Sequence, residues 1–430
     1  MFTQIVVALA LAGGTAPTPV LQEPAPAGRA ARITVEEAVG EALAGNPDLR
    51  AERERLPIAE AARVTAGLRP NPLLSASADH LDLLATRFTE TNGGGPAELT
   101  VRADMDWQRG GKRGRRIAVA DRARDVARFE VADLTRRLVF DVQSAFVDLL
   151  LAQQALALSR ENLAGFRKVA EISAARVRSG DLAEVELMRT RVALLQLENA
   201  VHRAELGRRL AQSRLQQLLG RPAGAAASLE AAGGFRPAGP GLPQVEALAQ
   251  VALEQRADLR AAVADEARSE AELRLQQALG RADYTVGTEY RRQQGVNGKS
   301  NSLGFFVSVP LPIFDRNQGE VARARVEAGQ AGLRVQARKA AVSGELRDAY
   351  EQHAAARSLL DRMEGQMLAD AREVRTVTEY AYQRGEASLV ELLDAERAFN
   401  DTMESYIGAQ AELARSLYLI DAVSGKGERP

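Results

Sequence analysis

The sequence contains no cysteine, and only 4% of its 430 residues are aromatic. The absence of cysteine excludes disulfide bridges, thiolate metal sites and a cysteine nucleophile. The formal net charge is −1, so the chain as a whole carries no bias toward nucleic acid. What is present is a 46% hydrophobic chain rich in Ala, Leu, Arg, Glu and Gln, a mixture that favours long helices over a compact core.

Proline is missing from two long blocks. None of the 16 prolines lies between Lys112 and Arg221, and only Pro430 follows Pro312. Because proline breaks helix interiors, each block predicts a very long helix followed by a shorter one. At 1.5 Å per residue, each long helix would measure about 100 Å, more than a globular domain needs. The expected helices are about 115–179, 181–219, 320–384 and 386–423.

Short motifs recur at a nearly constant offset, which indicates a duplicated unit. The motif "DLRA" occurs at 48–51 and 258–261, and "GDLAEVEL" at 180–187 matches "GEASLVEL" at 385–392. Each unit is expected to begin with one further helix, about 35–68 in the first and 245–279 in the second. The predicted organisation is a leader at 1–30, a first repeat at 31–220, a linker at 221–243, a second repeat at 244–424 and a tail at 425–430.

The segment "ELTVRADMDW" (98–107) alternates apolar residues with polar or charged ones. One apolar and one charged face over about ten residues is typical of a transmembrane β-strand, although a soluble hairpin with one wet face shows the same pattern. We expect two such hairpins, at about 73–108 and 284–313. Four strands cannot close a barrel, and a sheet in lipid cannot have open edges, so membrane strands would require several copies of the chain.

The end of the last expected strand contains Pro310 and Pro312. Proline cannot donate to a strand ladder, so we expect the strand to stop there and the chain to turn into a helix. Asp315 or Asn317 is expected to cap that helix. At the N-terminus, the apolar run 5–12 is too short to span a bilayer and indicates a signal peptide. No later segment shows the roughly 18 apolar residues of a membrane helix.

Four stretches resemble the TolC-like outer-membrane efflux family, and within it the CzcC-like branch that serves heavy-metal resistance pumps. The similarity covers about 33–424. It implies a mainly α-helical fold with a small β part, in which a homotrimer forms a hollow α-helical barrel in the periplasm, capped by a 12-stranded β-barrel in the outer membrane. The stretches are "ITVEEAVGEALAGNPDLRAERE", "AGLRPNPLLSAS", "VPLPIFDRNQGEVARAR" and "AYQRGEASLVELLDAERAF".

The resemblance also implies a function. Such proteins are passive exit ducts that catalyse no reaction, need no cofactor and export their cargo with a periplasmic adaptor and an inner-membrane pump, here of the resistance-nodulation-division type. Heavy-metal cations are the cargo that the branch suggests, with drugs or other organic compounds as the alternative. A soluble coiled-coil scaffold is the alternative from a different class of protein.

The resemblance places functional residues at the periplasmic end. Two glycine turns would form tips that contact the adaptor, although a plain helix–helix turn explains the glycines equally well. The tip residues are Arg178, Gly180, Asp181, Arg384, Gly385 and Glu386.

Three acids, Glu186, Glu391 and Asp394, would line the narrow entrance of the trimer, where clustered carboxylates favour cations. An ordinary solvated helix face is the alternative. Tyr382 matches a tyrosine that holds the family's entrance closed, but Ala387 replaces its partner arginine. Arg189 could pair with Asp394 instead.

Two further patterns point away from ligand chemistry. The basic stretch "RGGKRGRR" (109–116) lacks the spacing of a phosphate-binding loop and indicates either a junction near lipid headgroups or the start of a long helix. His80, His202 and His353 are isolated, so a histidine metal site is not expected.

Overall fold

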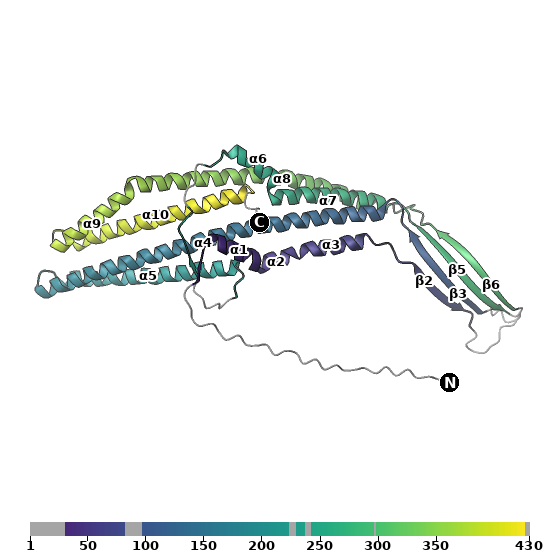
Figure 1. Ribbon diagram of the computed structural model, residues 1–430, viewed down its shortest axis with the longest axis horizontal. Coiled ribbons are helices and arrows are strands. Elements are labelled where there is room, and N and C mark those ends of the chain that lie inside the picture. The colour runs from purple at the N-terminus through teal and green to yellow at the C-terminus, as the bar shows by residue number, and fades with distance from the viewer. Residues whose placement is uncertain (1–30, 82–96, 223–228, 237–241, 296–297, 426–430) are drawn as a thin grey trace, which may run out of the picture.

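The computed structural model describes residues 31–81, 97–222, 229–236, 242–295 and 298–425. A four-stranded sheet lies at one end of a long, thin molecule, and two helical hairpins end in tips at the other (Figure 1). The predicted leader, the loop at 82–96, parts of the predicted linker and residues 426–430 lie outside the described residues.

The prediction of a single helix over 35–68 is wrong, because the chain forms three helices there. They are α1 (Val35–Gly45), α2 (Pro47–Arg53) and α3 (Arg55–Ala66). Asn46 between α1 and α2 has an extended backbone, and its side chain accepts a hydrogen bond from the Leu49 amide, with proline at the next position. This arrangement ends one helix and starts another.

The predicted helix 245–279 is likewise divided. It consists of α6 (Val245–Gln255) and α7 (Ala257–Leu279), and the extended residue Arg256 separates them. Arg256 occupies the position that Asn46 has in the first half, 210 residues earlier.

The first long helix is confirmed as one continuous element. α4 (Lys112–Ser179) has 68 residues and is followed by α5 (Glu184–Leu218). The prediction of an unbroken helix over 320–384 is wrong, because a π-helical turn (η1, Met363–Met367) separates α8 (Gln318–Arg362) from α9 (Leu368–Arg384). The last helix is α10 (Leu389–Val423).

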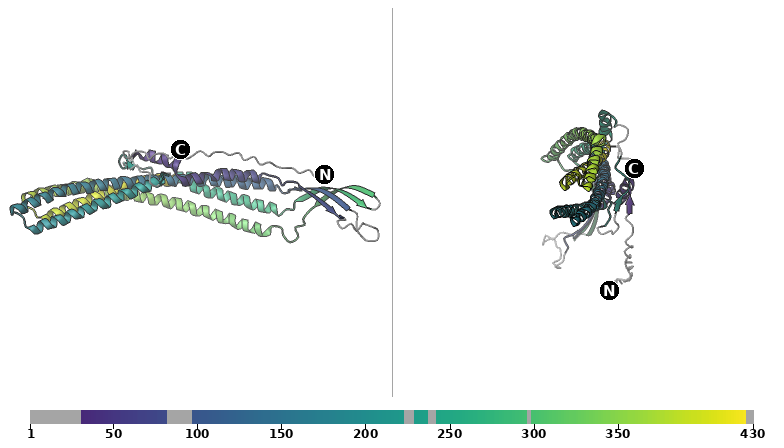
Figure 2. Two further views of the ribbon diagram at one scale, coloured as in Figure 1. Left: turned by 90° about the horizontal axis from the view of Figure 1, so that it is seen from below. Right: turned by 90° about the vertical axis from the view of Figure 1, so that its left-hand side faces the viewer.

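The helices lie side by side in one layer, and different helices make up this layer near the sheet and near the tips. Near the sheet the contacting neighbours are α3, α4, α7 and α8 in that order, and near the tips they are α5, α4, α10 and α9. Figures 1 and 2 show this long, shallow arrangement, in which α4 runs through both parts. One window of α4 is long and apolar enough to cross a membrane, contrary to the sequence expectation, but 44% of it is buried within the fold.

Matching joints hold the ends of α5 and α10. The Asn46 Nδ2 donates to the Leu218 carbonyl over 2.9 Å, and the Arg256 Nη1 donates to the Val423 carbonyl over 3.5 Å. Arg256 is 1% exposed and pairs with Asp258 and Glu345, each at 2.7 Å. A buried arginine with two carboxylates and a helix-end carbonyl satisfies the donors that burial would otherwise leave unpaired.

One small sheet was not predicted. β1 (Ala31–Ile33) pairs in parallel with β4 (Leu229–Ala231), which lies inside the segment expected to be a linker. Three-residue strands are too short to show an alternating pattern.

The four-stranded sheet is antiparallel, with the order β2-β3-β5-β6. Its strands are β2 (Leu73–Asp79), β3 (Ala97–Trp107), β5 (Tyr284–Gly295) and β6 (Gly298–Ser308). The polar stretch "RQQGVNGKSN" (292–301) predicts a loop between the two strands, but β5 and β6 extend through most of it. β6 ends before Pro310 and Pro312, as predicted.

Asn317 precedes α8, but it does not cap the helix with its side chain as expected. Its backbone is left-handed, with φ of 62°, and no side-chain cap bond is formed. The side chain instead donates to the Gln276 carbonyl over 2.8 Å, which joins the start of α8 to α7.

The register gives the sheet an apolar and a polar face, as the alternation in 98–107 predicted. Val101, Tyr290 and Leu303 are neighbours across three strands on the apolar face, and all three are exposed. The opposite face carries Arg102, which pairs with Asp104 at 2.9 Å. Phe306 interrupts this polar face, and the Arg102 guanidinium lies 4.6 Å from the centre of its ring.

Candidate functional site

Both tips are built by the same backbone turn. α4 ends at Gly180, with φ of 86°, and α9 ends at Gly385, with φ of 77°. The amide of the following residue bonds back to the helix, Asp181 to the Arg176 carbonyl and Glu386 to the Ala381 carbonyl, each over 2.9 Å. Glycine takes this left-handed conformation without strain, so the turns need no partner to form.

The residues predicted to contact an adaptor are exposed at these tips. Arg178, Asp181, Arg384 and Glu386 all present accessible side chains. The Ser179 hydroxyl donates to the Asp181 carboxylate over 2.8 Å, and the Arg384 guanidinium stacks on the Tyr380 ring at 4.3 Å. The tips therefore offer both signs of charge.

Tyr382 joins the two hairpins inside a single chain. It is 2% exposed, and its hydroxyl lies 2.8 Å from the Ser173 Oγ on α4. The Ser173 hydroxyl also donates to the Val169 carbonyl, so the tyrosine is the donor in the bond between them. Arg176 adds a hydrogen bond to the Tyr382 carbonyl over 3.4 Å and lies over its ring.

An apolar cluster surrounds this contact. Phe166 and Val169 of α4 pack with Leu389 and Leu392 of α10 and with Tyr382. Sequence reasoning found Tyr382 but missed Ser173 and Arg176, because nothing in the spacing of the α4 residues shows which of them faces α9.

Glu391 has a local structural role. Its carboxylate accepts hydrogen bonds from the amide and the hydroxyl of Ser388, at 2.7 and 2.8 Å, while the Ser388 hydroxyl accepts from the Glu391 amide. This is a capping box at the start of α10, and the signal S-x-x-E was readable in the sequence. The hydrogen bonds from the Ser388 amide and hydroxyl lower the pKa of Glu391.

The proposed pair between Arg189 and Asp394 is not formed within the chain. Arg189 bonds Glu186 on its own helix at 2.8 Å. Asp394 is 69% exposed and has Arg397 at 3.9 Å. Within one chain each group instead has an opposite charge three residues away on its own helix, which needs no second helix. No described contact joins Glu186 to Glu391 or Asp394, which lie on the other hairpin.

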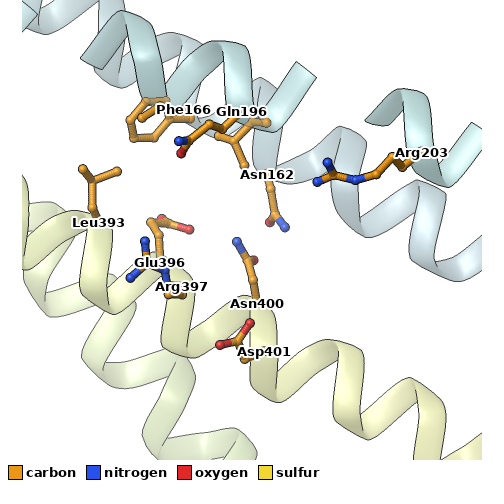
Figure 3. A pocket seen from close by; sticks show the side chains of 11 residues that line it. Asn162, Phe166, Gln196, Arg203, Leu393, Glu396, Arg397, Asn400 and Asp401 are labelled. Carbon is orange, nitrogen blue, oxygen red and sulfur yellow. The ribbon is translucent and has the colours of Figure 1, made fainter. Parts of the chain in front are cut away.

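A polar cleft of about 350 Å³ lies between the α4–α5 hairpin and α10. Figure 3 shows the amides of Asn162 and Asn400 directed toward each other across it. The Oδ1 atoms of both side chains are buried and find no hydrogen-bond partner among the described residues, and water in the cleft can supply the missing donors. Burial raises the pKa of Glu396, and Glu379 adds to this while Arg375 opposes it. Sequence reasoning missed this cleft.

The basic stretch 109–116 links three elements at the helix–sheet junction. Lys112, 5% exposed, pairs with Asp283 and donates to the Arg281 carbonyl, both at 2.7 Å. Arg113 and Arg116 donate to the carbonyls of Gly67 and Ala66 at the end of α3. Guanidinium groups at helix C-terminal carbonyls stabilise the helix end.

No group of three or more His, Asp or Glu side chains in the described part of the chain is placed to hold a metal ion. His353 contacts Ser416 between α8 and α10 at 3.1 Å. Burial lowers its pKa, as is usual for a histidine packed between helices.

Comparisons with known proteins agree with this geometry. The family model described as outer membrane efflux protein matches twice, over residues 38–221 and 248–426. The cobalt-zinc-cadmium resistance protein CzcC of Cupriavidus metallidurans is 26% identical over 413 residues, 96% of this chain and 94% of that protein. Nodulation protein T of Rhizobium leguminosarum bv. trifolii is 25% identical and covers 91% of this chain and 85% of its own.

Solved structures share the fold. The outer-membrane channel OprN matches with a TM-score of 0.76 at 20% identity, covering 92% of this chain and 91% of its own. The outer membrane channel CmeC of Campylobacter jejuni matches with a TM-score of 0.77 at 14% identity, covering 91% and 86%. The two family matches together span most of the sequence, and the chain belongs to the outer membrane efflux protein family.

Proposed function

We propose that three copies of this chain form a closed duct, in which three four-stranded sheets make a 12-stranded barrel in the outer membrane. The sheet is the observation that carries this proposal. Its apolar face is exposed, and β2 and β6 have no strand partner on their outer edges in the described chain. Unpaired backbone groups cost several kcal/mol each in lipid, so the edges need strands from neighbouring copies.

The edge helices near the tips support the same assembly. α5 exposes Val185, Met188, Val192 and Leu195, whose spacing of three and four residues forms one apolar seam. α9, at the other edge of the layer, exposes Val374, Val377 and Tyr380. In a cylinder of three chains, the α5 seam of one copy would pack against the α9 face of the next and remove both from water.

The polar face of the sheet would line the passage. Arg102, Asp104, Glu289 and Arg291 lie on the face opposite the apolar residues, and they form ion pairs with one another along the strands. A lumen of balanced charge lets a hydrated solute pass without binding it tightly. The duct would act as a passive conduit rather than an enzyme.

The helical tips would dock to a periplasmic adaptor, which in turn connects to an inner-membrane pump of the resistance-nodulation-division type. The exposed charges of Arg178, Asp181, Arg384 and Glu386 support this role. Glu186, Glu391 and Asp394 would surround the entrance, and the Tyr382–Ser173 bond would help hold it closed.

Heavy-metal cations are the proposed cargo. Similarity to the cobalt-zinc-cadmium resistance protein along nearly the whole chain supports this choice. The test is deletion of the gene, followed by complementation, with sensitivity measured to zinc, cobalt, cadmium and copper and to a panel of drugs. Raised sensitivity to metals alone supports the proposal. Raised sensitivity to drugs alone would mean that the duct exports organic compounds and not metal cations. A monomer that is soluble without detergent would contradict the duct itself.

A further inference from the structure

The junction between the helices and the sheet carries arginines without acidic partners. No ion pair with a carboxylate joins any of them in the described chain, whereas the neighbouring Lys112 is paired with Asp283. The junction therefore has an excess of positive charge. Its arginines are Arg69, Arg109, Arg113, Arg115, Arg116, Arg281 and Arg316.

Two of these arginines lie in one cavity. A cavity of about 250 Å³ is lined by Arg69, Arg113, Pro70, Met105 and Trp107, together with Asp106 and Gln108. Arg69 is exposed and has no hydrogen-bond partner in the described chain. Arg113 uses its Nε for the Gly67 carbonyl, which leaves its two terminal nitrogens for a ligand.

Two residues of the cavity lining, Met105 and Trp107, lie on the apolar face of the sheet. Trp107 is the last residue of β3 and is 65% exposed. It follows Val101 and Met105 on the face proposed to meet lipid. Phe314 and Leu311, 90% and 75% exposed, continue the apolar surface of the junction beyond β6. Tryptophan beside exposed apolar residues is typical of the boundary between hydrocarbon and headgroups.

The charge in the cavity favours an anion over a zwitterion. Its one carboxylate, Asp106, accepts a hydrogen bond from the Thr285 hydroxyl over 2.6 Å, across the strand pair. Asp106 keeps its negative charge, but the two guanidinium groups leave the lining with a net positive charge, and the other arginines of the junction add to it. Guanidinium groups bind phosphate with paired, charge-assisted hydrogen bonds.

We infer that this cavity holds the headgroup phosphate of an anionic phospholipid from the periplasm-facing leaflet. Arg69 and Arg113 bind the phosphate, Trp107 lies at the level of the glycerol backbone, and Met105 contacts the start of an acyl chain. The inference deepens the proposed function, because it depends on the apolar face of the sheet lying in lipid.

The test uses the fact that Trp107 is the chain's only tryptophan. The full-length chain is reconstituted in phosphatidylcholine vesicles that contain either brominated phosphatidylglycerol or brominated phosphatidylcholine at equal mole fraction. Bromine quenches tryptophan fluorescence at short range. We expect brominated phosphatidylglycerol to quench Trp107 at lower mole fractions than brominated phosphatidylcholine does. Each of the two arginines should contribute about a fivefold preference for phosphatidylglycerol.

Three variants distinguish loss of lipid binding in the cavity from a general disturbance of the protein. R69Q removes a guanidinium that makes no hydrogen bond or ion pair in the described chain, so it should lower the preference about fivefold without disturbing the protein. R69Q/R113Q should remove the preference. R325Q/R347Q changes two exposed arginines of α8 that form no ion pair with any described residue, and it should keep the preference.

Each other outcome overturns the inference in a recognisable way. Equal quenching by the two lipids in the parent protein excludes headgroup selection while leaving membrane insertion intact. Absence of quenching by both places Trp107 outside the bilayer and contradicts the lipid face of the proposed duct. Loss of the phosphatidylglycerol preference on adding inorganic phosphate would show that the cavity binds a free anion instead. An unchanged preference in R69Q/R113Q would exclude Arg69 and Arg113 as the groups that bind the headgroup.

Discussion

At the scale of single residues, Tyr382 is the side chain that connects the two hairpins at the tips. Its buried hydroxyl donates to Ser173. Y382F should remove this bond at a cost of about 1 kcal/mol and loosen the hairpins, so we expect more frequent openings of the reconstituted protein in planar bilayers. Y380F is the matched control, because Tyr380 is on the same helix but 54% exposed. Identical behaviour of both variants and the parent would argue against a closing role.

Asp394 tests the proposed entrance. Its carboxylate is exposed and only loosely paired, so D394K should leave folding intact while replacing negative charge by positive charge in every copy of the proposed trimer. We expect the ratio of cation to anion permeability to fall severalfold, measured as a shift in reversal potential under a salt gradient. Unchanged selectivity would place Asp394 on an ordinary solvated surface.

Glu391 caps the start of α10, and this role can be tested separately from the charge of its carboxylate. Its lowered pKa means that the capping bonds stabilise α10 above the unfolded pKa of about 4.3 and are lost as pH falls through the folded value. E391A should therefore speed amide hydrogen exchange in the first turn of α10 at neutral pH. E391Q, which retains an acceptor, should exchange more slowly than E391A; equal rates would exclude the capping role.

At the scale of elements, two glycines end α5 and α10 at matching positions. Gly220 has φ of 75° and Gly425 has φ of 77°, but a Cβ on Gly220 would lie 2.4 Å from the Gly45 carbonyl oxygen, whereas on Gly425 the nearest atom is 3.5 Å away. Both alanine variants incur backbone strain of about 1–3 kcal/mol, and G220A adds a clash. We expect G220A to lower the thermal unfolding midpoint more than G425A, and the reverse order would contradict this.

The element boundaries show how far sequence patterns reach. The absence of proline predicted α4 and α5 well, because an unbroken periodic stretch has few alternatives to helix. The break at Asn46 was missed although it has a local signal, a capping asparagine followed by proline. The break at Arg256 has no such signal, and Arg256 bonds a carbonyl at the end of α10, 167 residues away along the chain. The π-helical turn at Met363–Met367 has no proline or other local signal. The partners of Tyr382 could not be predicted either, because they depend on how two distant hairpins meet.

At the scale of the whole molecule, the proposed closed duct would depend on the exposed seam of α5. M188D would place a charge among Val185, Val192 and Leu195, so we expect the trimer to dissociate at a lower temperature or detergent concentration, measured by native mass spectrometry. R191D introduces the same side chain on a neighbouring face of α5 and should have a smaller effect. Equal loss in both variants would mean that charge alone, and not the seam, is responsible.

The buried apolar side chains form separate groups strung out along the layer rather than one shared interior. One group packs under α1 and α5, another lies between α6 and α8, and a third holds the tips together. Each group receives support mainly from its immediate neighbours, so heat or denaturant should melt the protein in sections instead of in a single step. Damage at the periplasmic end would then be confined there, and the four strands of the sheet would keep their pairing while the far tip came apart.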